Sequence, residues 1–316
     1  MTPDVAASLR TRLIQALANR SPGARVAIVG WSVAAIELAG DPVFALGAAS
    51  LVGCYAPEAG GSVLLLSELA SARPDIVVIA EDGGKELLLA AVAELVPAVT
   101  TIVIGGFDHF AFRDDLFDRV RRDALIPSFA NGYPNCLVHI YQCLRNAHAR
   151  GLTGVVAEFG MFKGGTTMLM SRFIEELGAA WKVIGFDTFD GFPPKRSPLD
   201  MYAHPDCVFL NVDILRAMFA GRNVEIVEGD VVDTCSRLQD ERLVLSFVDT
   251  DNFTSASAIL AVVADRTQVG GAVVFDHWTG LDRHLDTIGE RMAAMTLSAD
   301  PRYFNLHGTG VFLRQE

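Results

Sequence analysis

Residues 154–166, GVVAEFGMFKGGT, contain the transition that decides the fold of the C-terminal half of the chain. The first six of these residues are mostly apolar and include two valines, which is typical of a buried strand. Gly160, Gly164 and Gly165 then permit a tight turn and close approach by a ligand, and Thr166 opens a helical stretch. This pattern predicts a βαβ unit with a ligand site at its turn.

The alternation of strand and helix continues from this turn to the C-terminus. Such alternation predicts a parallel sheet covered by helices, and the glycines near the end of 303–313 predict an antiparallel hairpin. The predicted strands are 154–159, 182–186, 224–228, 243–248 and 271–275, and the predicted helices are 136–150, 166–177 and 255–265. Five parallel strands closed by a hairpin resemble the plan of the Rossmann-like class I methyltransferase sheet.

A second, smaller alternation occupies the N-terminal part of the chain. Its predicted strands are 25–30, 50–55, 75–80 and 100–105, which indicates a small α/β, Rossmann-like domain. A charged stretch and a turn-rich stretch follow. We therefore place the domain boundary near residue 127, which gives domains 1–127 and 128–316.

The first turn of the N-terminal domain, Gly30-Trp31-Ser32, occurs where a nucleotide-binding loop would lie. It lacks the second and third glycines that let a pyrophosphate approach the backbone. We expect this domain to be noncatalytic, serving acceptor binding or dimerisation in a homo-oligomer. The alternative is a nucleotide-dependent oxidoreductase that binds a nicotinamide or flavin there.

The composition narrows the classes of partner. The net charge is −12, with 26 basic against 38 acidic residues, and no Lys/Arg cluster offers a patch for phosphates, so nucleic acid is not expected as a partner. No apolar run reaches the ~20 residues of a membrane span, and the N-terminus does not resemble a secretory signal. We expect a cytoplasmic protein. The five cysteines form no CxxC pair, which disfavours a disulfide framework or a zinc–cysteine site.

Ligands of open parallel sheets bind at the carboxyl ends of the strands, so the residues that end strands are the candidates for a site. Glu158 and Phe159 end the first strand of the C-terminal domain, and this acid has the chemistry to accept from a ligand ammonium. Asp187 ends the second strand, about 20 residues on, where a carboxylate binds ribose hydroxyls or caps the next turn. Asp230 follows the third strand, positioned for an adenine amino group or for capping the following helix.

The fourth and fifth strands end in further acids and an imidazole. Asp249 and Asp251 follow one strand, and Asp276 and His277 follow the other. Like charges this close need a cation, a proton or a ligand, and oxygen donors with one nitrogen suit Mg²⁺ or Mn²⁺. The alternative is that Asp251 caps the helix beginning near Ser255 while His277 acts as a general base without metal.

Five motifs, in order and spacing, resemble the macrocin O-methyltransferase family, whose members methylate deoxysugar hydroxyls on macrolides and related natural products. The motifs are AEFGMFKGGTTMLM, VIGFDTFDGFPP, VEGDVVDT, SFVDTDNFTSA and VGGAVVFDHW. The resemblance covers residues from about 135 to 316. It differs from the family pattern in having Asp276-His277 where two adjacent acids are usual, and Asn252-Phe253 where Leu-Tyr is common.

The resemblance implies S-adenosylmethionine as cofactor, with Mg²⁺ or another divalent cation held by acids of the fourth and fifth strands. The cofactor-binding residues that the resemblance implies are Glu158, Gly160, Gly164, Gly165, Thr166 and Asp187. Phe159 and Asp230 are further candidates because of their positions at strand ends. The metal ligands that the resemblance implies are Asp249 and Asp276, and the position of His277 beside them makes it a third candidate ligand. The candidate catalytic residues are Asp249, Asp251 and His277.

The sulfonium of the cofactor is already activated, so the protein chiefly has to orient a small-molecule acceptor and remove its proton. A bound metal would lower the acceptor pKa, and His277 or Asp251 would take the proton. The Pro-rich segment 191–207 is interpreted as a lid over the site or as an ordinary surface loop. O-methylation of a sugar or natural-product hydroxyl is the expected reaction, with metal-free N-methylation as the alternative.

Overall fold

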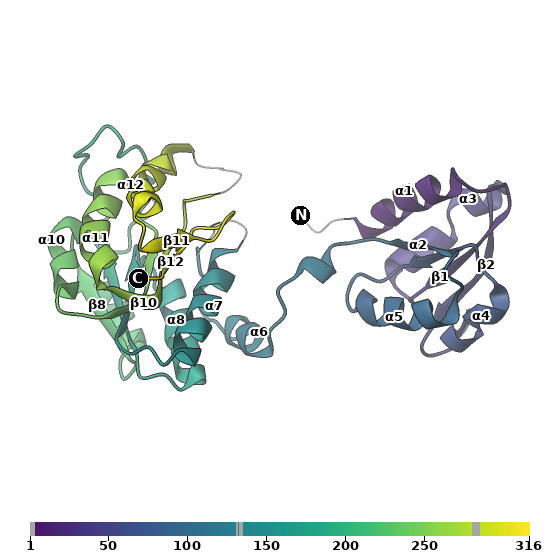
Figure 1. The fold of residues 1–316 in the computed structure, drawn as a ribbon, viewed down its shortest axis with the longest axis horizontal. Helices are drawn as coiled ribbons and strands as arrows, with labels where there is room; N and C mark the ends of the chain where they lie inside the picture. The colour runs from purple at the N-terminus through teal and green to yellow at the C-terminus, as the bar shows by residue number, and fades with distance from the viewer. Residues whose placement is uncertain (1–3, 131, 133–134, 280–284) are drawn as a thin grey trace. The chain divides into compact units, whose positions relative to one another are not determined.

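The computed structural model describes residues 4–130, 132, 135–279 and 285–316. The chain divides into two compact units, Met1–Phe112 (unit 1) and Arg113–Glu316 (unit 2), and each is described by itself (Figure 1). The division lies earlier in the chain than the boundary near residue 127 that the sequence indicates.

Helix α6 (Asp115–Arg122) explains this difference, because it packs on unit 2 against α8 (Gly165–Leu177). The ring of Phe117 stacks on Phe173 with 5.7 Å between the centroids. Only Phe117 and Val120 of this helix are buried, so its sequence resembles a charged linker. The burial of these two apolar side chains nevertheless makes the helix part of unit 2.

Unit 1 is built on a five-stranded parallel sheet in the order β3-β2-β1-β4-β5. The strands are β1 (Ala24–Val29), β2 (Ala49–Ala56), β3 (Val63–Leu65), β4 (Ile76–Ile79) and β5 (Thr101–Ile104). The helices are α1 (Val5–Leu17), α2 (Val33–Ala39), α3 (Pro42–Ala45), α4 (Leu69–Ala72) and α5 (Lys85–Leu95). One apolar cluster packs α1 and α2 on one face of the sheet, and a second packs α4 and α5 on the other, which confirms the predicted α/β layering. The short strand β3 was not predicted.

Unit 2 contains a seven-stranded sheet in the order β11-β12-β10-β9-β6-β7-β8. The strands are β6 (Val155–Phe159), β7 (Lys182–Asp187), β8 (Val224–Glu228), β9 (Leu243–Val248), β10 (Thr267–Phe275), β11 (Tyr303–Asn305) and β12 (Val311–Arg314). The first five run parallel, and β12 pairs antiparallel with both β10 and β11. The predicted parallel sheet with its antiparallel hairpin is confirmed. The strand order reverses between β6 and β9, which is where an open sheet binds ligands.

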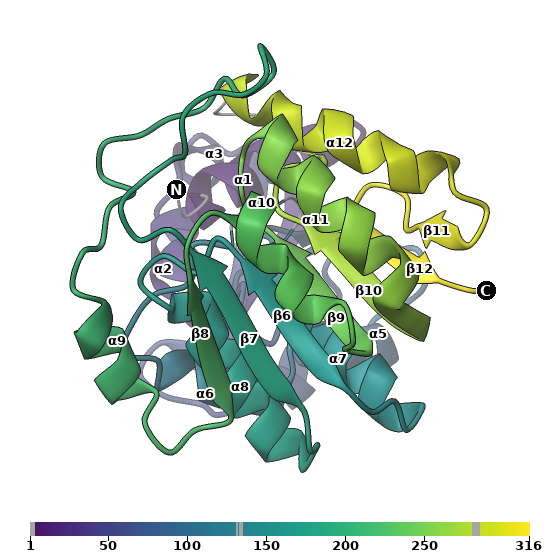
Figure 2. The ribbon, with the colours of Figure 1, turned by 90° about the vertical axis from the view of Figure 1, so that its left-hand side faces the viewer.

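Helices cover both faces of this sheet (Figure 2). Those of one face are α6, α7 (Cys136–Ala149) and α8; those of the other are α10 (Val231–Thr234), α11 (Phe253–Arg266) and α12 (Ile288–Ala299). Helix α9 (Val212–Met218) packs with the edge strand β8. Single-turn 3₁₀ helices occur at Leu66–Glu68, Asp108–Phe110, Cys235–Leu238 and Leu285–Thr287. Within the described ranges, no helix has both the length and the apolarity required to cross a bilayer.

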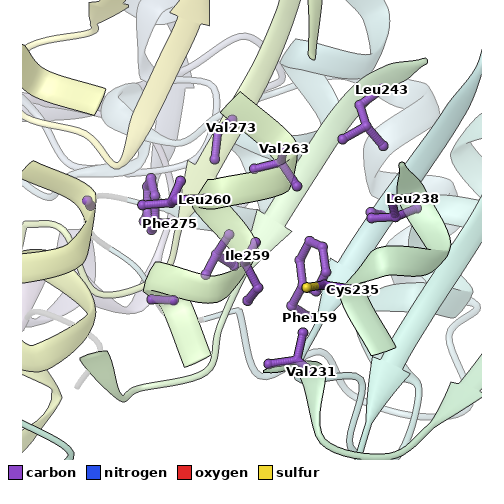
Figure 3. Packing of buried hydrophobic residues seen from close by; sticks show 14 of the residues in the cluster. Phe159, Val231, Cys235, Leu238, Leu243, Ile259, Leu260, Val263, Val273 and Phe275 are labelled. Carbon is purple, nitrogen blue, oxygen red and sulfur yellow. The ribbon is translucent and has the colours of Figure 1, made fainter. Parts of the chain in front are cut away.

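The main core of unit 2 lies between the sheet and helices α10, α11 and α12 (Figure 3). Phe159 of β6 and Phe275 of β10 point into it beside Ile259 of α11. Both faces of the central strands are buried, which explains why they read as continuous apolar runs rather than alternating ones. The core therefore fixes the strand ends from which the site is built.

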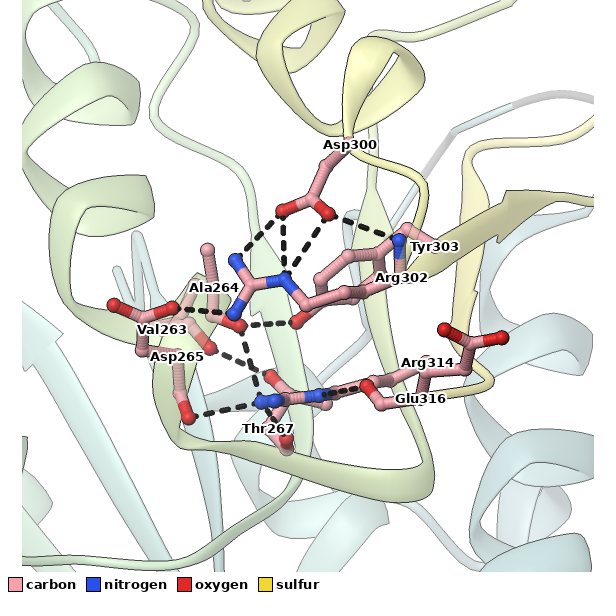
Figure 4. A network of polar contacts seen from close by, with 9 residues as sticks. All are labelled: Val263, Ala264, Asp265, Thr267, Asp300, Arg302, Tyr303, Arg314 and Glu316. Carbon is pink, nitrogen blue, oxygen red and sulfur yellow. Dashed lines mark hydrogen bonds and ion pairs between the residues drawn. The ribbon is translucent and has the colours of Figure 1, made fainter.

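Two arginines clamp the C-terminal hairpin to the end of α11 (Figure 4). Arg314 Nη1 donates to the carbonyl oxygens of Ala264 and Asp265, at 3.2 and 2.8 Å. Arg302 forms ion pairs of 2.7 Å with Asp300 and with Asp265. A guanidinium at a helix C-terminus satisfies carbonyls that lack intrahelical partners and complements the helix dipole.

Candidate active site

A cavity of about 940 Å³ opens in unit 2 at the carboxyl ends of β6, β7, β9 and β10. It brings together most of the strand-end residues singled out from the sequence. The predicted residues that line it are Glu158, Gly160, Gly165, Thr166, Asp187, Asp249, Asp251, Asp276 and His277. Phe159, Gly164 and Asp230 are not among its lining residues.

The glycines of the turn after β6 are required by neighbouring protein backbone. Gly160 has φ +93°, and a Cβ there would lie 2.0 Å from the carbonyl oxygen of Asp249. A Cβ on Gly165 would lie 2.1 Å from the carbonyl oxygen of Pro127. The sequence predicts that both glycines permit a tight turn and close approach by a ligand, and the structure adds this independent packing reason.

The chain that leads into α7 lies against the same turn. The hydroxyls of Ser128 and Thr166 are 2.7 Å apart, and the rings of Phe129 and Phe162 meet edge to face. Together with Pro127, which faces Gly165, these contacts join residues 127–129 to the turn. We call residues 127–129 the entry segment.

Glu158 is a buried carboxyl at the end of β6, with 2% of its surface exposed. It accepts a hydrogen bond from the hydroxyl of Thr167 in α8. Burial and the nearby charge of Asp187 raise the pKa of Glu158 to about 8, although the Thr167 bond opposes the shift. A buried acid of this kind gains a partner when a cation binds in the cavity.

Asp187 holds the turns that follow β6 and β7. Its Oδ2 accepts from the Phe162 N–H and its Oδ1 from the Phe189 N–H, each at 2.7 Å. Both phenylalanines have left-handed backbones, with φ +49° and +61°. Burial raises the Asp187 pKa. The turn-capping alternative is thus present, and the same carboxylate also lines the cavity, where its remaining lone pairs suit ribose hydroxyls.

Asp230 and Phe159 have other contacts in the structure. Asp230 Oδ1 accepts from the Val232 N–H at 3.0 Å, which caps α10, and its Oδ2 is 2.8 Å from Arg196 Nη1. The capping alternative is therefore the role that the structure shows for this side chain. Phe159 is fully buried in the core and stacks on Phe186, with 4.9 Å between ring centroids.

The acids after β9 and β10 surround one imidazole. His277 Nε2 lies 3.0 Å from Asp251 Oδ1 and 3.6 Å from oxygens of both Asp249 and Asp276. Burial opposes protonation of His277, but the hydrogen bond to Asp251 and the charges of Glu290, Asp251 and Asp276 raise its pKa to about 9. Burial and the neighbouring carboxylates likewise raise the pKa of Asp249. We call Asp249, Asp251, Asp276 and His277 the acidic rim.

Three donors of the acidic rim are close enough to share a divalent cation. Ligand atoms of Asp249, Asp251 and His277 all lie within 4.8 Å of one another. This donor set has the oxygen and imidazole chemistry expected for Mg²⁺ or Mn²⁺. It contains Asp251 in place of the predicted Asp276, whose Oδ1 accepts from the Gly132 N–H at 2.7 Å.

Helix α11 is capped by a residue from a distant segment rather than by Asp251. Asp200, which is buried, accepts from the Thr254 N–H at 2.8 Å and from the Thr254 hydroxyl at 2.7 Å. Asn252 exchanges two hydrogen bonds with the backbone of Tyr202, at 3.0 and 2.9 Å. Segment 191–207 is therefore fastened to the start of α11 at two points, and it contributes Tyr202 and His204 to the cavity wall.

Glu290 in α12 is a further polar residue of this region that the sequence interpretation missed. It is fully buried, and its carboxylate accepts from backbone N–H groups at the ends of β9 and β10. Burial raises its pKa to about 7, with His277 opposing the shift. The available signal was one acid on an otherwise mostly apolar helix, IGERMAAMTLSA.

Comparison with solved structures finds methyltransferases at low sequence identity. The O-methyltransferase NovP has 18% identity and a TM-score of 0.47, with 57% of this chain and 78% of that chain covered. The calicheamicin methyltransferase CalS11 has 19% identity and a TM-score of 0.47, with 66% and 97% covered.

The sequence comparisons identify the family. The family model for macrocin O-methyltransferase (TylF) matches residues 134–315, more than half of the chain. A Streptomyces olivaceus relative, 8-demethyl-8-(2,3-dimethoxy-alpha-L-rhamnosyl)-tetracenomycin-C 4'-O-methyltransferase, is 25% identical over 191 residues, covering 56% of this chain and 72% of the relative. The resemblance predicted from the motifs is confirmed, and the protein is an S-adenosylmethionine-dependent methyltransferase. This chain belongs to the macrocin O-methyltransferase family.

Proposed function

We propose that the enzyme methylates a hydroxyl of a sugar or small natural product, with the acidic rim as its catalytic centre. The observation that carries the proposal is the contact of 3.0 Å between Asp251 and His277 on the wall of the cavity. The named activity of the Streptomyces olivaceus relative, methylation at a sugar oxygen, supports the same class of acceptor.

We assign S-adenosylmethionine to the half of the cavity formed by β6 and β7. Glu158 would accept from the ammonium of the cofactor and Asp187 from its ribose hydroxyls, while Gly160 and Thr166 border the turn between them. Calorimetry of Glu158→Gln and Asp187→Asn with S-adenosylhomocysteine tests this assignment. Undiminished affinity in both variants would contradict it.

Methyl transfer needs an acceptor oxygen in line with the methyl carbon. The oxygen attacks that carbon, the carbon–sulfur bond breaks with its electrons staying on sulfur, and the acceptor proton passes to a base. We assign the base to Asp251, because its carboxylate lines the cavity while a pKa of about 9 keeps His277 protonated near neutral pH. His277 then orients Asp251 through their hydrogen bond.

A divalent cation fits the acidic rim. Asp249 and His277 would hold it together with Asp251 or Asp276, and it would supply Lewis-acid assistance to loss of the acceptor proton. His277 coordinates only when neutral, so a proton and a metal ion compete for its Nε2. Methyl transfer measured in EDTA tests the requirement, since an unchanged rate excludes an essential ion.

The direct test of the reaction is mass spectrometry of S-adenosylmethionine incubated with rhamnosylated aromatic glycosides. A mass gain of one methyl group on the sugar supports the proposal, and NMR of the product distinguishes O- from N-methylation. A product methylated only on nitrogen, or the absence of product across hydroxyl acceptors when an amine is methylated, would favour the metal-free N-methyltransferase alternative.

We propose a noncatalytic role for unit 1, in acceptor binding or in assembly of a homo-oligomer, in a cytoplasmic enzyme. Its first turn has one glycine before Trp31 and Ser32, and Ser32 is occupied in capping α2. Light scattering of the full chain tests assembly. Titration with NADH tests the oxidoreductase alternative, which requires binding there.

A further inference from the structure

The carboxylate of Glu290, in α12, binds both the loop after β9 and the loop after β10, which together carry the acidic rim. Its Oε2 accepts from the N–H groups of Thr250 and Asp251, at 2.9 and 3.0 Å. Its Oε1 accepts from the N–H of His277 at 3.1 Å. A single buried side chain thus holds the loop after β9 and the loop after β10 at a fixed separation.

The loop after β9 needs such a restraint because its backbone is strained. Asp251 has φ +61°, in the left-handed region that non-glycine residues rarely adopt. The N–H of Asn252 bonds back to the carbonyl oxygen of Thr250 at 2.6 Å, which closes a tight turn around Asp251. Strained conformations persist where surrounding contacts over-determine them, and the two N–H groups held by Glu290 supply such contacts here.

The position of Glu290 is itself fixed by close packing of α12. A Cβ on the preceding residue, Gly289, would lie 2.3 Å from the carbonyl oxygen of Leu199 and 3.0 Å from the nitrogen of Phe253. Helix α12 therefore begins in direct contact with segment 191–207 and with the first residue of α11. This contact leaves the Glu290 side chain little freedom to move away from the rim.

We propose that Glu290 is a positioning residue for methyl transfer, which sets the separation of Asp251 and His277 across the acidic rim. The inference rests on the proposed function, because it assumes that the Asp251–His277 pair acts on the acceptor. Glu290 has no part in lining the cavity, so it acts through the two loops rather than on the substrate.

Glu290→Gln is the informative substitution, because the side chain keeps its shape but one acceptor oxygen becomes an NH₂ donor. That donor must face either the N–H of His277 or the N–H pair of Thr250 and Asp251, so one loop loses its anchor. Leu297→Ala is the matched control. Leu297 is a buried core residue of the same helix, and its truncation lowers stability without touching either loop.

The primary readout requires no acceptor. NMR of ¹³C-histidine-labelled full-length protein with S-adenosylhomocysteine bound reports the imidazole of His277, assigned by loss of its signal in His277→Gln. We expect Glu290→Gln to move this signal toward that of a solvent-exposed histidine and Leu297→Ala to leave it in place. An unmoved signal in Glu290→Gln, or an equal movement in Leu297→Ala, would overturn the inference.

Hydrogen exchange of the unaltered enzyme provides a test that does not depend on folding of a variant. The backbone N–H groups of Thr250, Asp251 and His277 should exchange roughly 100-fold or more slowly than those of an open loop, because Glu290 holds them. Exchange at open-loop rates would equally overturn the inference.

Turnover distinguishes this inference from the proposed function. With 4-nitrophenyl α-L-rhamnoside as acceptor, we expect Glu290→Gln to lower kcat roughly 10- to 100-fold while KM for S-adenosylmethionine stays within about twofold. Asp251→Asn retaining full turnover would contradict the proposed function. Asp251→Asn losing turnover while Glu290→Gln keeps it would contradict the role of Glu290 alone.

Discussion

Replacing Gly160 by alanine would place a methyl group between the two central strands of unit 2. Gly160 follows β6, has φ +93°, and faces the carbonyl oxygen of Asp249 at the end of β9, only 2.0 Å from where the Cβ would lie. Ordinary contact requires at least 3.4 Å, so the two strand ends would have to separate by more than 1 Å. That movement would shift Asp249, and with it the acidic rim.

Two effects should lower the free energy of unfolding in Gly160→Ala. Alanine in a left-handed backbone costs roughly 1–2 kcal/mol, and forcing a methyl group into a packed site typically costs about 1–3 kcal/mol more. Gly178 separates these parts, because it has φ +69° at the end of α8 and its Cβ would meet nothing within 4 Å. We therefore expect Gly178→Ala to lower the free energy of unfolding by about 1–2 kcal/mol and Gly160→Ala by about 2–5 kcal/mol.

Urea denaturation measures both variants against the unaltered chain. Because the chain has two units, the transition of unit 2 is the one that S-adenosylhomocysteine shifts to higher urea. Calorimetry with the same ligand should show affinity falling at least tenfold in Gly160→Ala and remaining unchanged in Gly178→Ala. Equal losses of stability in the two variants would refute the conclusion that Gly160 is required by its contact with Asp249.

Three further predictions concern the cofactor end of the cavity and segment 191–207. Because the pKa of Glu158 is raised to about 8, its carboxyl is neutral below that pH, and the affinity for S-adenosylhomocysteine should fall about tenfold per pH unit as the pH drops below 8. Calorimetry of Glu158→Gln should show no such dependence of affinity on pH. An equal dependence in this variant would contradict the assignment of Glu158 to the cofactor. Asp230→Ala should lower the free energy of unfolding by about 1 kcal/mol through loss of the α10 cap, while the affinity for S-adenosylhomocysteine stays the same. Weaker binding of S-adenosylhomocysteine would instead favour a contact between Asp230 and adenine. Asn252→Ala should accelerate proteolytic cleavage within 191–207, because the segment loses both bonds to Tyr202; cleavage at the unaltered rate would show that Asp200 alone fastens it.

The strand ends of unit 2 were predictable because the sequence patterns that mark them are local. Each apolar run and the polar residue that ends it lie within a few positions of each other, and parallel strands bring those ends to one edge of the sheet. Asp187, Asp249 and His277 accordingly line one cavity, as the sequence indicates. The short strand β3 lacks this signal, because three residues do not establish a period.

Contacts made over long distances along the chain could not be read from local patterns. The cap of α11 is Asp200, 54 residues before its partner Thr254, and the acid that holds the rim loops is Glu290, 40 residues after Thr250. A carboxylate in a helix gives no sequence signal that distinguishes a solvated position from a buried one beside strand ends. The pairing of Asp251 with His277, rather than with the helix it precedes, likewise depends on the tertiary fold.

The entry segment determines where this enzyme can be divided for engineering. A chimera joined at residue 128 would exchange Pro127 and the α6 helix, which means replacing the backbone that Gly165 packs against and the ring that stacks on Phe173. A junction at Phe112–Arg113 keeps all of these contacts within one parent sequence. Exchange of N-terminal units among relatives should therefore preserve cofactor affinity only when all residues from Arg113 onward come from the same parent sequence.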